Sequence, residues 1–463
     1  MAHSTYTYHY RSRSRLEPGR GDRLLLLATS GGVIAGAPAA EPRLFTGALT
    51  APEPTAAALL AVADIAAARY YRPGTAALRD PVVTCHQDRL RFESFSGCCG
   101  VHARVDVLPG GFDGGAVTPG TTNVDVSTDL RVALSRVTAA DALRLSVGPQ
   151  DVTVTTGDAA IEEKKVPLPE RWLRGFAEVQ AITSAFDLRA ELPGTAAFRF
   201  LQGRVRGPRA GVLWAVPAGR SLRATGRPVP GAVCLPGPER LAVLLPLLRF
   251  ARALRVYGPP VSAAERPVAS AWELDLGVLR IVLTLSPEPH RGFSGEGAVL
   301  GALTGEEAAA DADLLAALLA FDPVLEIGRL AASSGLPPVR VRAALTALGT
   351  AGRVGYDLAE AAFFHRELPY DAARVDRMNP RLRTARALVE SGAVAASGDL
   401  VTVTVGDHAQ RVRFAADGSA SCTCRWWTDY RGTRGRCSHV LAAEIARDTA
   451  QSAIDISSPG GMA

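Results

Sequence analysis

Apolar positions along the chain alternate in some segments and recur with a helical period in others. Residues 23–29 form a compact apolar run that predicts a strand, 90–108 predict two strands around a glycine-rich turn, and 270–285 predict a strand pair. Residues 56–69 and 170–186 have the spacing of amphipathic helices. Strands and helices mixed in this way predict an α+β fold for the first 300 residues.

Shifts in these patterns divide the chain into four parts. A clearer helical pattern begins near residue 303, and a short strand-rich module follows it. Within the first part, a boundary near Pro167 would give two subdomains. We predict an α+β region over 1–302, a winged-helix-like segment over 303–370, a small C-terminal module over 371–449 and a disordered tail over 450–463.

The segment from Glu306 has the pattern of three helices followed by a hairpin. The helices are expected over 306–321, 324–332 and from 338 onward, where Pro337-Pro338 opens the third. In the first helix, we expect one buried side to carry Leu314, Leu315, Leu318 and Leu319.

Charge argues against the DNA-binding role that many winged helices have. The third helix carries Arg340 and Arg342, but residues 306–368 hold five basic and nine acidic side chains. Phosphate neutralisation supplies most non-specific affinity for DNA, and a segment of charge −4 lacks it. We therefore expect this segment to contact protein or to be purely structural.

Composition places the chain among globular proteins. Of its 463 residues, 47% are hydrophobic, and no apolar stretch is long enough for a membrane span. The longest candidate, 241–254, is interrupted by two arginines and predicts a buried helix. We find no signal peptide and no disulfide framework among the seven cysteines. These features predict a cytoplasmic protein with no membrane partner.

Basic side chains are densest between Arg199 and Arg255. This stretch holds eleven arginines and one acidic residue, Glu239. It could attract an anionic partner such as nucleic acid. The alternative is an ordinary solvated face of a protein in which arginine is the usual cation.

The C-terminal module holds two closely spaced pairs of metal-ligating residues. Cys422 and Cys424 form one pair, and Cys437 and His439 form the other after twelve residues. Residues i and i+2 of an extended chain point to the same face, so the first pair can reach one ion. The second pair opens a predicted helix over 440–447, whose N-terminus favours thiolate. Three cysteines and one histidine leave no open position, which predicts one structural Zn²⁺.

This pattern resembles the SWIM zinc finger, and further segments resemble bacterial SWIM zinc finger family proteins. In the wider class, the finger is an interaction element for nucleic acid or protein. The bacterial relatives often occur beside MoxR-type AAA ATPases and von Willebrand factor A domain proteins, so the resemblance implies an adaptor role with such partners. The segments that carry it are 92–100 (FESFSGCCG), 167–172 (PLPERW), 291–297 (RGFSGEG), Trp426-Trp427 and 430–432 (YRG).

The loop between the two metal pairs combines arginines with aromatic side chains. Such residues stack on unpaired bases and are enriched at protein interfaces. The alternative is that a tryptophan packs beneath the metal while the arginines are solvated. We predict that this loop is the partner-binding surface, formed by Arg425, Trp426, Trp427, Tyr430, Arg431, Arg434 and Arg436.

Other constellations are weaker. Cys98, Cys99 and His102, with Cys85 and His86 upstream, could form a second metal or redox site or could be small buried residues of a tight sheet. The phosphate-binding loop and the H-E-x-x-H motif are absent, and Glu296 replaces the last glycine of a G-x-S-x-G elbow.

These observations predict a zinc-binding adaptor or scaffold that contacts protein partners and is not an enzyme. The alternative is a nucleic-acid-binding protein that uses the finger loop and the arginine-rich stretch. A third hypothesis, an unfamiliar enzyme within the first 300 residues, has no motif in its support.

Overall fold

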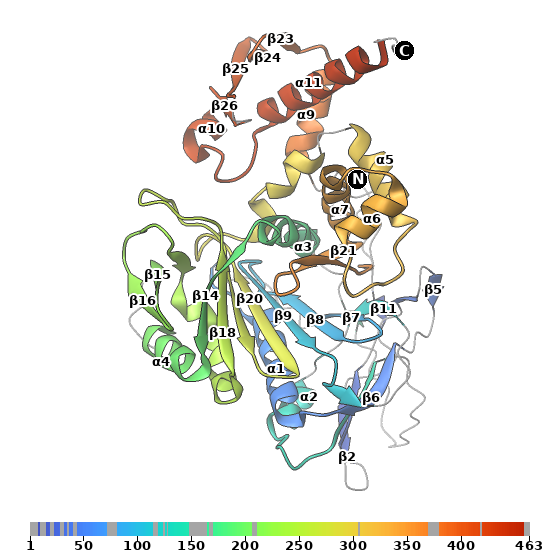
Figure 1. The fold of residues 1–463 in the computed structure, drawn as a ribbon, viewed down its shortest axis with the longest axis vertical. Helices are drawn as coiled ribbons and strands as arrows, with labels where there is room; N and C mark the ends of the chain where they lie inside the picture. The colour runs from blue at the N-terminus through green and yellow to red at the C-terminus, as the bar shows by residue number, and fades with distance from the viewer. Residues whose placement is uncertain are drawn as a thin grey trace.

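We describe the protein from a computed structural model. Several short strands are described before residue 44, and nearly continuous chain follows from there. The structure describes residues 8–9, 15–18, 23–27, 32–34, 37–39, 44–71, 81–113, 119–123, 126, 128–147, 164–165, 170–205, 211–303, 306–368, 379–416 and 419–457. Figure 1 shows three tiers along the longest axis: a sheet-based body, a middle layer of helices and a C-terminal finger.

A ten-stranded antiparallel sheet organises the body. Its strands come from both sides of Pro167, and β9 and β20 are hydrogen-bonded along seven residue pairs. The boundary that we considered near Pro167 therefore does not separate two sheets. In sheet order the strands are β14 (Asp187–Pro193), β18 (Ala253–Gly258), β19 (Ser270–Asp275), β20 (Leu279–Leu285), β9 (Val101–Val107), β8 (Leu90–Phe95), β7 (Val82–Cys85), β11 (Gly120–Asn123), β4 (Gly32–Ile34) and β5 (Ala37–Ala39).

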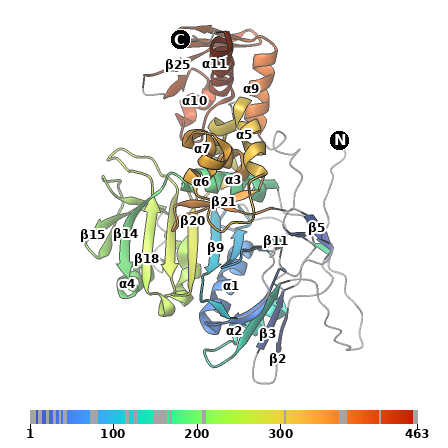
Figure 2. The ribbon, with the colours of Figure 1, turned by 45° about the vertical axis from the view of Figure 1, so that its right-hand side comes forward.

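Smaller sheets flank this one, and Figure 2 shows β2 and β3 at the far end of the body from the finger. A five-stranded sheet has the order β10 (Phe112–Asp113), β6 (Phe45–Leu49), β12 (Leu143–Val147), β3 (Arg23–Leu27) and β2 (Arg15–Pro18). A three-stranded sheet has the order β16 (Ser221–Thr225), β15 (Val212–Ala218) and β17 (Val233–Pro236), and β1 (Tyr8–His9) pairs with β13 (Lys164–Lys165).

One face of the large sheet is apolar and forms the main core. Side chains such as Val105, Ile281 and Leu283 are fully buried there against the covering helices. The buried helix predicted over 241–254 is present as a 3₁₀ helix that ends at Phe250, and β18 follows. Pro246 lies inside it and cannot donate an α-helical hydrogen bond. The covering helices are α1 (Pro52–Ala67), α4 (Gly194–Val205) and η1 (Pro238–Phe250), and α2 (Thr128–Ser135) contacts α1.

The opposite face of the sheet is buried as well, although it carries charged side chains. Helix α3 (Glu170–Thr183) packs near one end of this face, and Asp357 of the middle-layer hairpin contacts Arg91, Arg104 and Arg280 on its central strands. Arg91, Asp106 and Glu273 on this face are 0% exposed.

The middle layer has the predicted order of three helices and a hairpin. Leu315 is fully buried, but Leu314 and Leu318 are 45% and 39% exposed, which corrects their predicted burial. The buried stripe of α5 runs through Ala312 and Leu315, and Leu314 falls beside it. The helix ends at Ala316 and not at the predicted residue 321, so Leu318 lies in the turn that follows. The elements are α5 (Glu306–Ala316), α6 (Ile327–Ser334), α7 (Pro338–Thr350), β21 (Val354–Asp357) and β22 (Ala362–His365).

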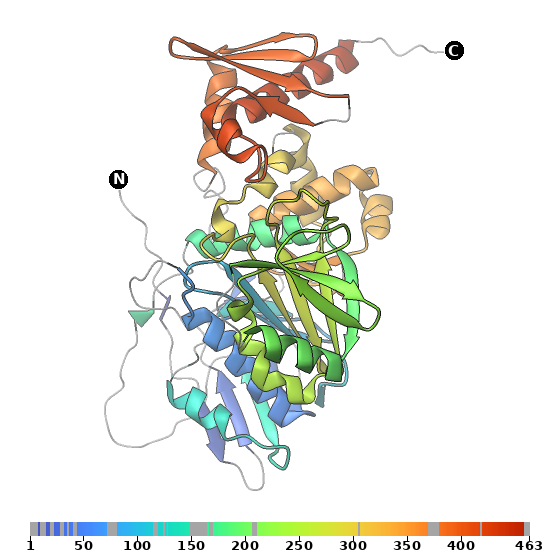
Figure 3. The ribbon, with the colours of Figure 1, turned by 90° about the vertical axis from the view of Figure 1, so that its left-hand side faces the viewer.

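The finger is a four-stranded sheet held between helices, and it lies at the end of the long axis in Figure 3. Helix α11 continues to Ser457, which corrects the disordered tail for 450–457, because no glycine or proline interrupts it before Pro459. Residues 458–463 lie outside the described residues. The elements are α9 (Pro380–Glu390), β23 (Val394–Ser397), β24 (Leu400–Val405), β25 (His408–Phe414), β26 (Ala420–Cys422), α10 (Arg425–Tyr430) and α11 (Ser438–Ser457), and short 3₁₀ helices η2 (Phe293–Gly295) and η3 (Ala298–Leu303) precede the middle layer.

Among the described residues, no helix combines the length and apolarity required to cross a bilayer.

Candidate functional site

Three cysteines and a histidine of the finger converge on one point. Cys422 ends β26, Cys424 caps the N-terminus of α10, and Cys437 and His439 lie at the start of α11. Their four ligand atoms all lie within 4.8 Å of one another. The three thiols are buried, whereas His439 is half-buried. Zn–S bonds of about 2.3 Å at tetrahedral angles place ligand atoms roughly 4 Å apart, so this group matches a zinc site in size.

Local backbone geometry favours metal-bound thiolates at two of these positions. The backbone N–H of Trp427 donates to Cys424 Sγ at 3.4 Å, and that of Val440 donates to Cys437 Sγ at 3.4 Å. Both donors lie in the first turn of a helix, where N–H groups stabilise negative charge. Contact with Cys422, and then burial, raises the pKa of the Cys437 thiol to about 12. Thiols packed this closely cannot all ionise unless a cation compensates them, and Zn²⁺ supplies that charge.

No second group of metal-ligating side chains occurs among the residues that the structure describes. Cys98 Sγ accepts a hydrogen bond from the Tyr70 backbone at 3.5 Å, and Cys99 donates to the carbonyl of Arg171 at 3.2 Å. His102 Nε2 lies 3.3 Å from a carboxylate oxygen of Glu93. Cys85 is buried in β7, and burial raises its thiol pKa. These residues behave as buried members of the sheet.

The first half of the predicted contact loop is a helix, α10, rather than an irregular loop. Arg425 on this helix is 95% exposed and lies 3.7 Å from Asp429. Arg431 follows it in the left-handed region (φ 44°) and is exposed. Trp427 is half-buried against the core around the cysteines, and so is Trp426, which agrees with the packing alternative for both tryptophans.

Several side chains of the loop have partners elsewhere in the chain. The Trp426 ring lies 4.5 Å from that of Tyr430, and the Arg434 guanidinium lies 5.0 Å from the Tyr430 ring. Arg434 Nη2 donates to the carbonyl of Gly295 in the body at 3.3 Å. Arg436 forms an ion pair with Glu444 of α11. Trp426, Arg434 and Arg436 therefore already have partners within the chain, whereas Arg425 and Arg431 face solvent.

Helix α9 fixes the same loop from the other side. Arg381 Nη1 donates to the carbonyl oxygens of Arg434 at 2.7 Å and Arg436 at 2.9 Å. A Cβ atom on Gly435 would lie 2.3 Å from the backbone oxygen of Gly297. The finger is thus docked on the body through close backbone contacts that sequence reasoning missed.

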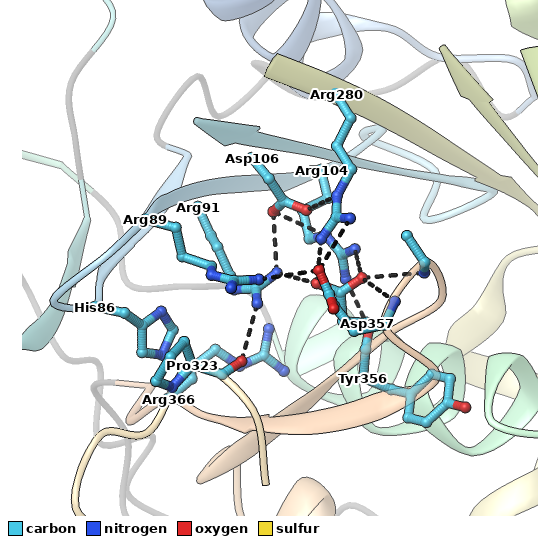
Figure 4. Close-up of polar contacts among 12 residues, drawn as sticks. His86, Arg89, Arg91, Arg104, Asp106, Arg280, Pro323, Tyr356, Asp357 and Arg366 are labelled. Atoms are coloured by element: carbon cyan, nitrogen blue, oxygen red, sulfur yellow. Dashed lines mark hydrogen bonds and ion pairs between the residues drawn. The ribbon is translucent and has the colours of Figure 1, made fainter. Parts of the chain in front are cut away.

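A buried charge cluster joins the sheet to the hairpin of the middle layer (Figure 4). Arg91, Asp106 and Arg280 are direct cross-strand neighbours on β8, β9 and β20. Asp357 of β21 faces this row and accepts from Arg91 at 2.6 Å, from Arg280 at 2.5 Å and from Arg104 at 2.9 Å. Burial alone would raise the pKa of Asp357, but the three guanidinium groups lower it well below its ordinary value. Asp357 therefore stays ionised and ties the hairpin to the sheet.

A second buried pair extends this contact. Arg366 donates to a carboxylate oxygen of Glu93 at 2.6 Å, and His86 Nε2 lies 2.7 Å from the carbonyl of His365. The charged residues alternate with apolar ones in β8 and β9, a pattern that sequence alone assigns to a solvent-facing side. We interpret the cluster as a structural contact between the sheet and the hairpin, because each of its carboxylates is ion-paired with arginine.

Comparison with known proteins identifies the C-terminal module. The family model of the SWIM zinc finger matches residues 401–448, which include all four candidate ligands. No curated protein matches the chain. A crystal structure of Proliferating Cellular Nuclear Antigen from Entamoeba histolytica aligns over 53% of this chain and 99% of its own, at 9% identity and a TM-score of 0.33, a similarity too low to indicate a shared fold. Residues 401–448 are therefore a SWIM zinc finger, whose Cys₃His group fits one structural zinc ion.

Proposed function

We propose that the protein is an adaptor that binds a protein partner through the exposed part of its SWIM finger. The observation that carries this proposal is the division of the loop residues into those engaged within the protein and those that are exposed. Trp426 contacts Arg381 of α9, Arg434 contacts the body and Arg436 pairs with Glu444, while Arg425 and Arg431 are exposed. A loop held by its engaged residues presents the exposed ones without a large ordering cost.

Packing of the middle layer supports a structural role for the winged-helix-like segment. Arg340 of α7 makes a bidentate ion pair with Asp311 of α5, at 2.8 and 2.7 Å. Gln180 of α3 donates to the carbonyl of Thr346 at 3.0 Å, so this side of α7 is covered. The hairpin is held on the sheet by Asp357. Arg340 and the hairpin are therefore engaged within the protein, whereas Arg342 of α7 is exposed, and the segment's negative charge remains the main argument against DNA binding.

The alternative function is binding of nucleic acid through the finger and the arginine-rich stretch. Several arginines of that stretch are engaged within the protein. Arg240 is fully buried and donates to three backbone carbonyls, and Arg255 pairs with Glu191, Glu273 and Asp275. The half-buried Trp427, one helical turn before the exposed Arg431, is the feature that favours this alternative, because an aromatic ring near a cation suits an unpaired base.

The proposal assigns no catalytic reaction to the chain and places it in the cytoplasm. None of the seven cysteines forms a disulfide, which supports a reducing compartment. The resemblance to bacterial SWIM proteins makes a MoxR-type AAA ATPase or a von Willebrand factor A domain protein the first partner to test.

A direct binding experiment separates the two functions. Full-length, zinc-loaded protein is immobilised, and nuclease-treated candidate partners are measured by biolayer interferometry, with a fluorescent single strand measured by anisotropy in parallel. We expect Arg425→Ala with Arg431→Ala to weaken protein binding by ~10-fold or more, about 1.4 kcal/mol. Arg413→Ala, another exposed arginine of the finger, is the matched control.

The outcomes point in different directions. Loss of single-strand binding without a nuclease-resistant protein partner would support the alternative. If the double variant bound every partner as tightly as the control, Arg425 and Arg431 would not belong to the contact surface.

A further inference from the structure

A cavity of about 280 Å³ lies where the finger meets the body. Its wall combines α3, the segment around η2 and η3, α9 and the finger loop. The charged side chains that line it are Arg174, Glu178, Arg381 and Arg434, and the indole of Trp426 forms part of the wall. A cavity of this size accommodates a small molecule or a single ionised group.

Two of the lining arginines lack a carboxylate partner among the described residues. Arg381 donates to the carbonyl oxygens of Arg434 and Arg436, and its guanidinium lies 4.7 Å from the Trp426 ring. Arg434 donates to the carbonyl of Gly295, and its guanidinium lies 5.5 Å from the same ring. Burial lowers the pKa of Arg381, while the charge of Glu178 acts in the opposite direction. Most other buried arginines of the body, by contrast, lie against Asp or Glu.

Donors at this cavity are left without acceptors. Trp426 Nε1 and Arg434 Nε are both buried and have no hydrogen-bond partner within the described part of the chain. Indole and guanidinium nitrogens can only donate. A buried donor without a partner costs about 1–3 kcal/mol, so an occupant that supplied an acceptor to either group through a small side-chain movement would be favoured.

The acidic residue of the wall does not neutralise these charges. Both oxygens of Glu178 are already engaged: they accept from the backbone N–H groups of Gly297 at 2.7 Å and Ala298 at 2.6 Å. Burial raises the pKa of Glu178 to about 7, so at neutral pH it carries only part of a negative charge. The wall as a whole is therefore positive.

We propose that this cavity binds a small oxyanion, the phosphate or carboxylate group of a small molecule, between Arg381, Arg434 and the Trp426 indole. Both functional groups present several acceptor oxygens, and guanidinium groups bind each of them in the same way. The proposal is independent of the adaptor function, because the cavity is lined by Trp426 and Arg434 and not by the exposed Arg425 and Arg431. An anion bound here would contact α9 and the finger loop together and would stabilise their docking.

Isothermal titration calorimetry on the full-length, zinc-loaded protein tests the site. Inorganic phosphate and citrate serve as separate probes at constant ionic strength, which distinguishes a phosphate site from a carboxylate site. We expect at least one of them to bind with a dissociation constant of ~1 mM or lower. Arg434→Gln should weaken that binding by ~10-fold or more, about 1.4 kcal/mol. Arg383→Gln on α9, an exposed arginine outside the cavity, should leave it unchanged.

A second variant keeps the test valid if Arg434→Gln disturbs the docking of the finger. Trp426→Phe removes the indole N–H but keeps an aromatic ring, and it should weaken the same anion while the zinc content stays at one ion per chain. Absence of binding by both anions would show that the cavity holds only water. Equal losses in Arg434→Gln and Arg383→Gln would show that the effect is one of net charge, and either result would overturn the proposal.

Discussion

Replacing Asp357 with asparagine should destabilise the joint between the sheet and the hairpin. The carboxylate is 1% exposed and contacts Arg91, Arg104 and Arg280, whose side chains are 0%, 5% and 7% exposed. With Asp106 as the other buried carboxylate of this group, the substitution changes its net charge from +1 to +2. Asparagine keeps an oxygen for the N–H of Ala359, so the turn itself is preserved.

The expected loss is large because the remaining charges cannot reach water. Breaking a buried ion pair by removing one partner costs about 3–5 kcal/mol. We expect Asp357→Asn to lower the free energy of unfolding by that amount in urea titrations. Hydrogen exchange should accelerate over β21 and β22 before it does so over β8 and β9, because the hairpin loses its anchor.

An exposed ion pair of the same segment provides the control. Asp322 lies 3.0 Å from Arg329, whose side chain is 56% exposed, and such pairs contribute about 0–1 kcal/mol. Asp322→Asn should therefore change the stability by less than 1 kcal/mol. The reasoning would be refuted if Asp357→Asn cost no more than this control, because the cluster would then be solvated or dispensable.

Three further predictions concern the finger and the joint. Cys424→Ser combined with His439→Ala should remove zinc and unfold the finger, since structural zinc contributes on the order of 10 kcal/mol; elemental analysis that still found one zinc per chain would show that the ligands are misassigned. Gly435→Ala should separate the finger from the body while zinc is retained, because Gly435 has φ 71° and its new Cβ would lie 2.3 Å from the Gly297 oxygen; proteolysis of the finger loop at the wild-type rate would contradict this. Burial, and then the charge of Arg91, lowers the pKa of His86 to about 3, so between pH 6.5 and 3 the unfolded chain binds a proton that the folded chain does not. Stability should fall by up to about 1.4 kcal/mol per unit as the pH drops through this window, and a parallel pH profile in His86→Gln would exclude His86 as the cause.

The sequence was sufficient for features whose determinants are close together in the chain. Cys422 and Cys424 on a strand end, and Cys437 and His439 at a helix start, place four ligands within reach of one ion by local geometry. The order of three helices and a hairpin also followed from local periodicity, as did the strand pair over 270–285.

Long-range contacts were beyond such reasoning. Arg91 and Asp357 are 266 residues apart, and nothing near either residue indicates the other. The alternation of charged and apolar residues in β8 predicts a strand with one solvent-exposed face. Both faces are buried, because the hairpin packs on the charged face and its Asp357 carboxylate pairs with the arginines there. Arg434 illustrates the same limit: its attraction for a partner was inferred from composition, while its contact with Gly295 depends on how the finger sits on the body.

The position of Asp357 late in the chain has a consequence for biosynthesis. A ribosome completes the strands that carry Arg91, Arg104 and Arg280 well before it reaches Asp357, so in the nascent sheet these three guanidinium groups share the carboxylate of Asp106. Until the hairpin emerges, this face stays hydrated and the sheet is incomplete as a folding unit. A fragment ending at residue 302 would be arrested at that stage, with a positively charged surface that the full-length protein never exposes.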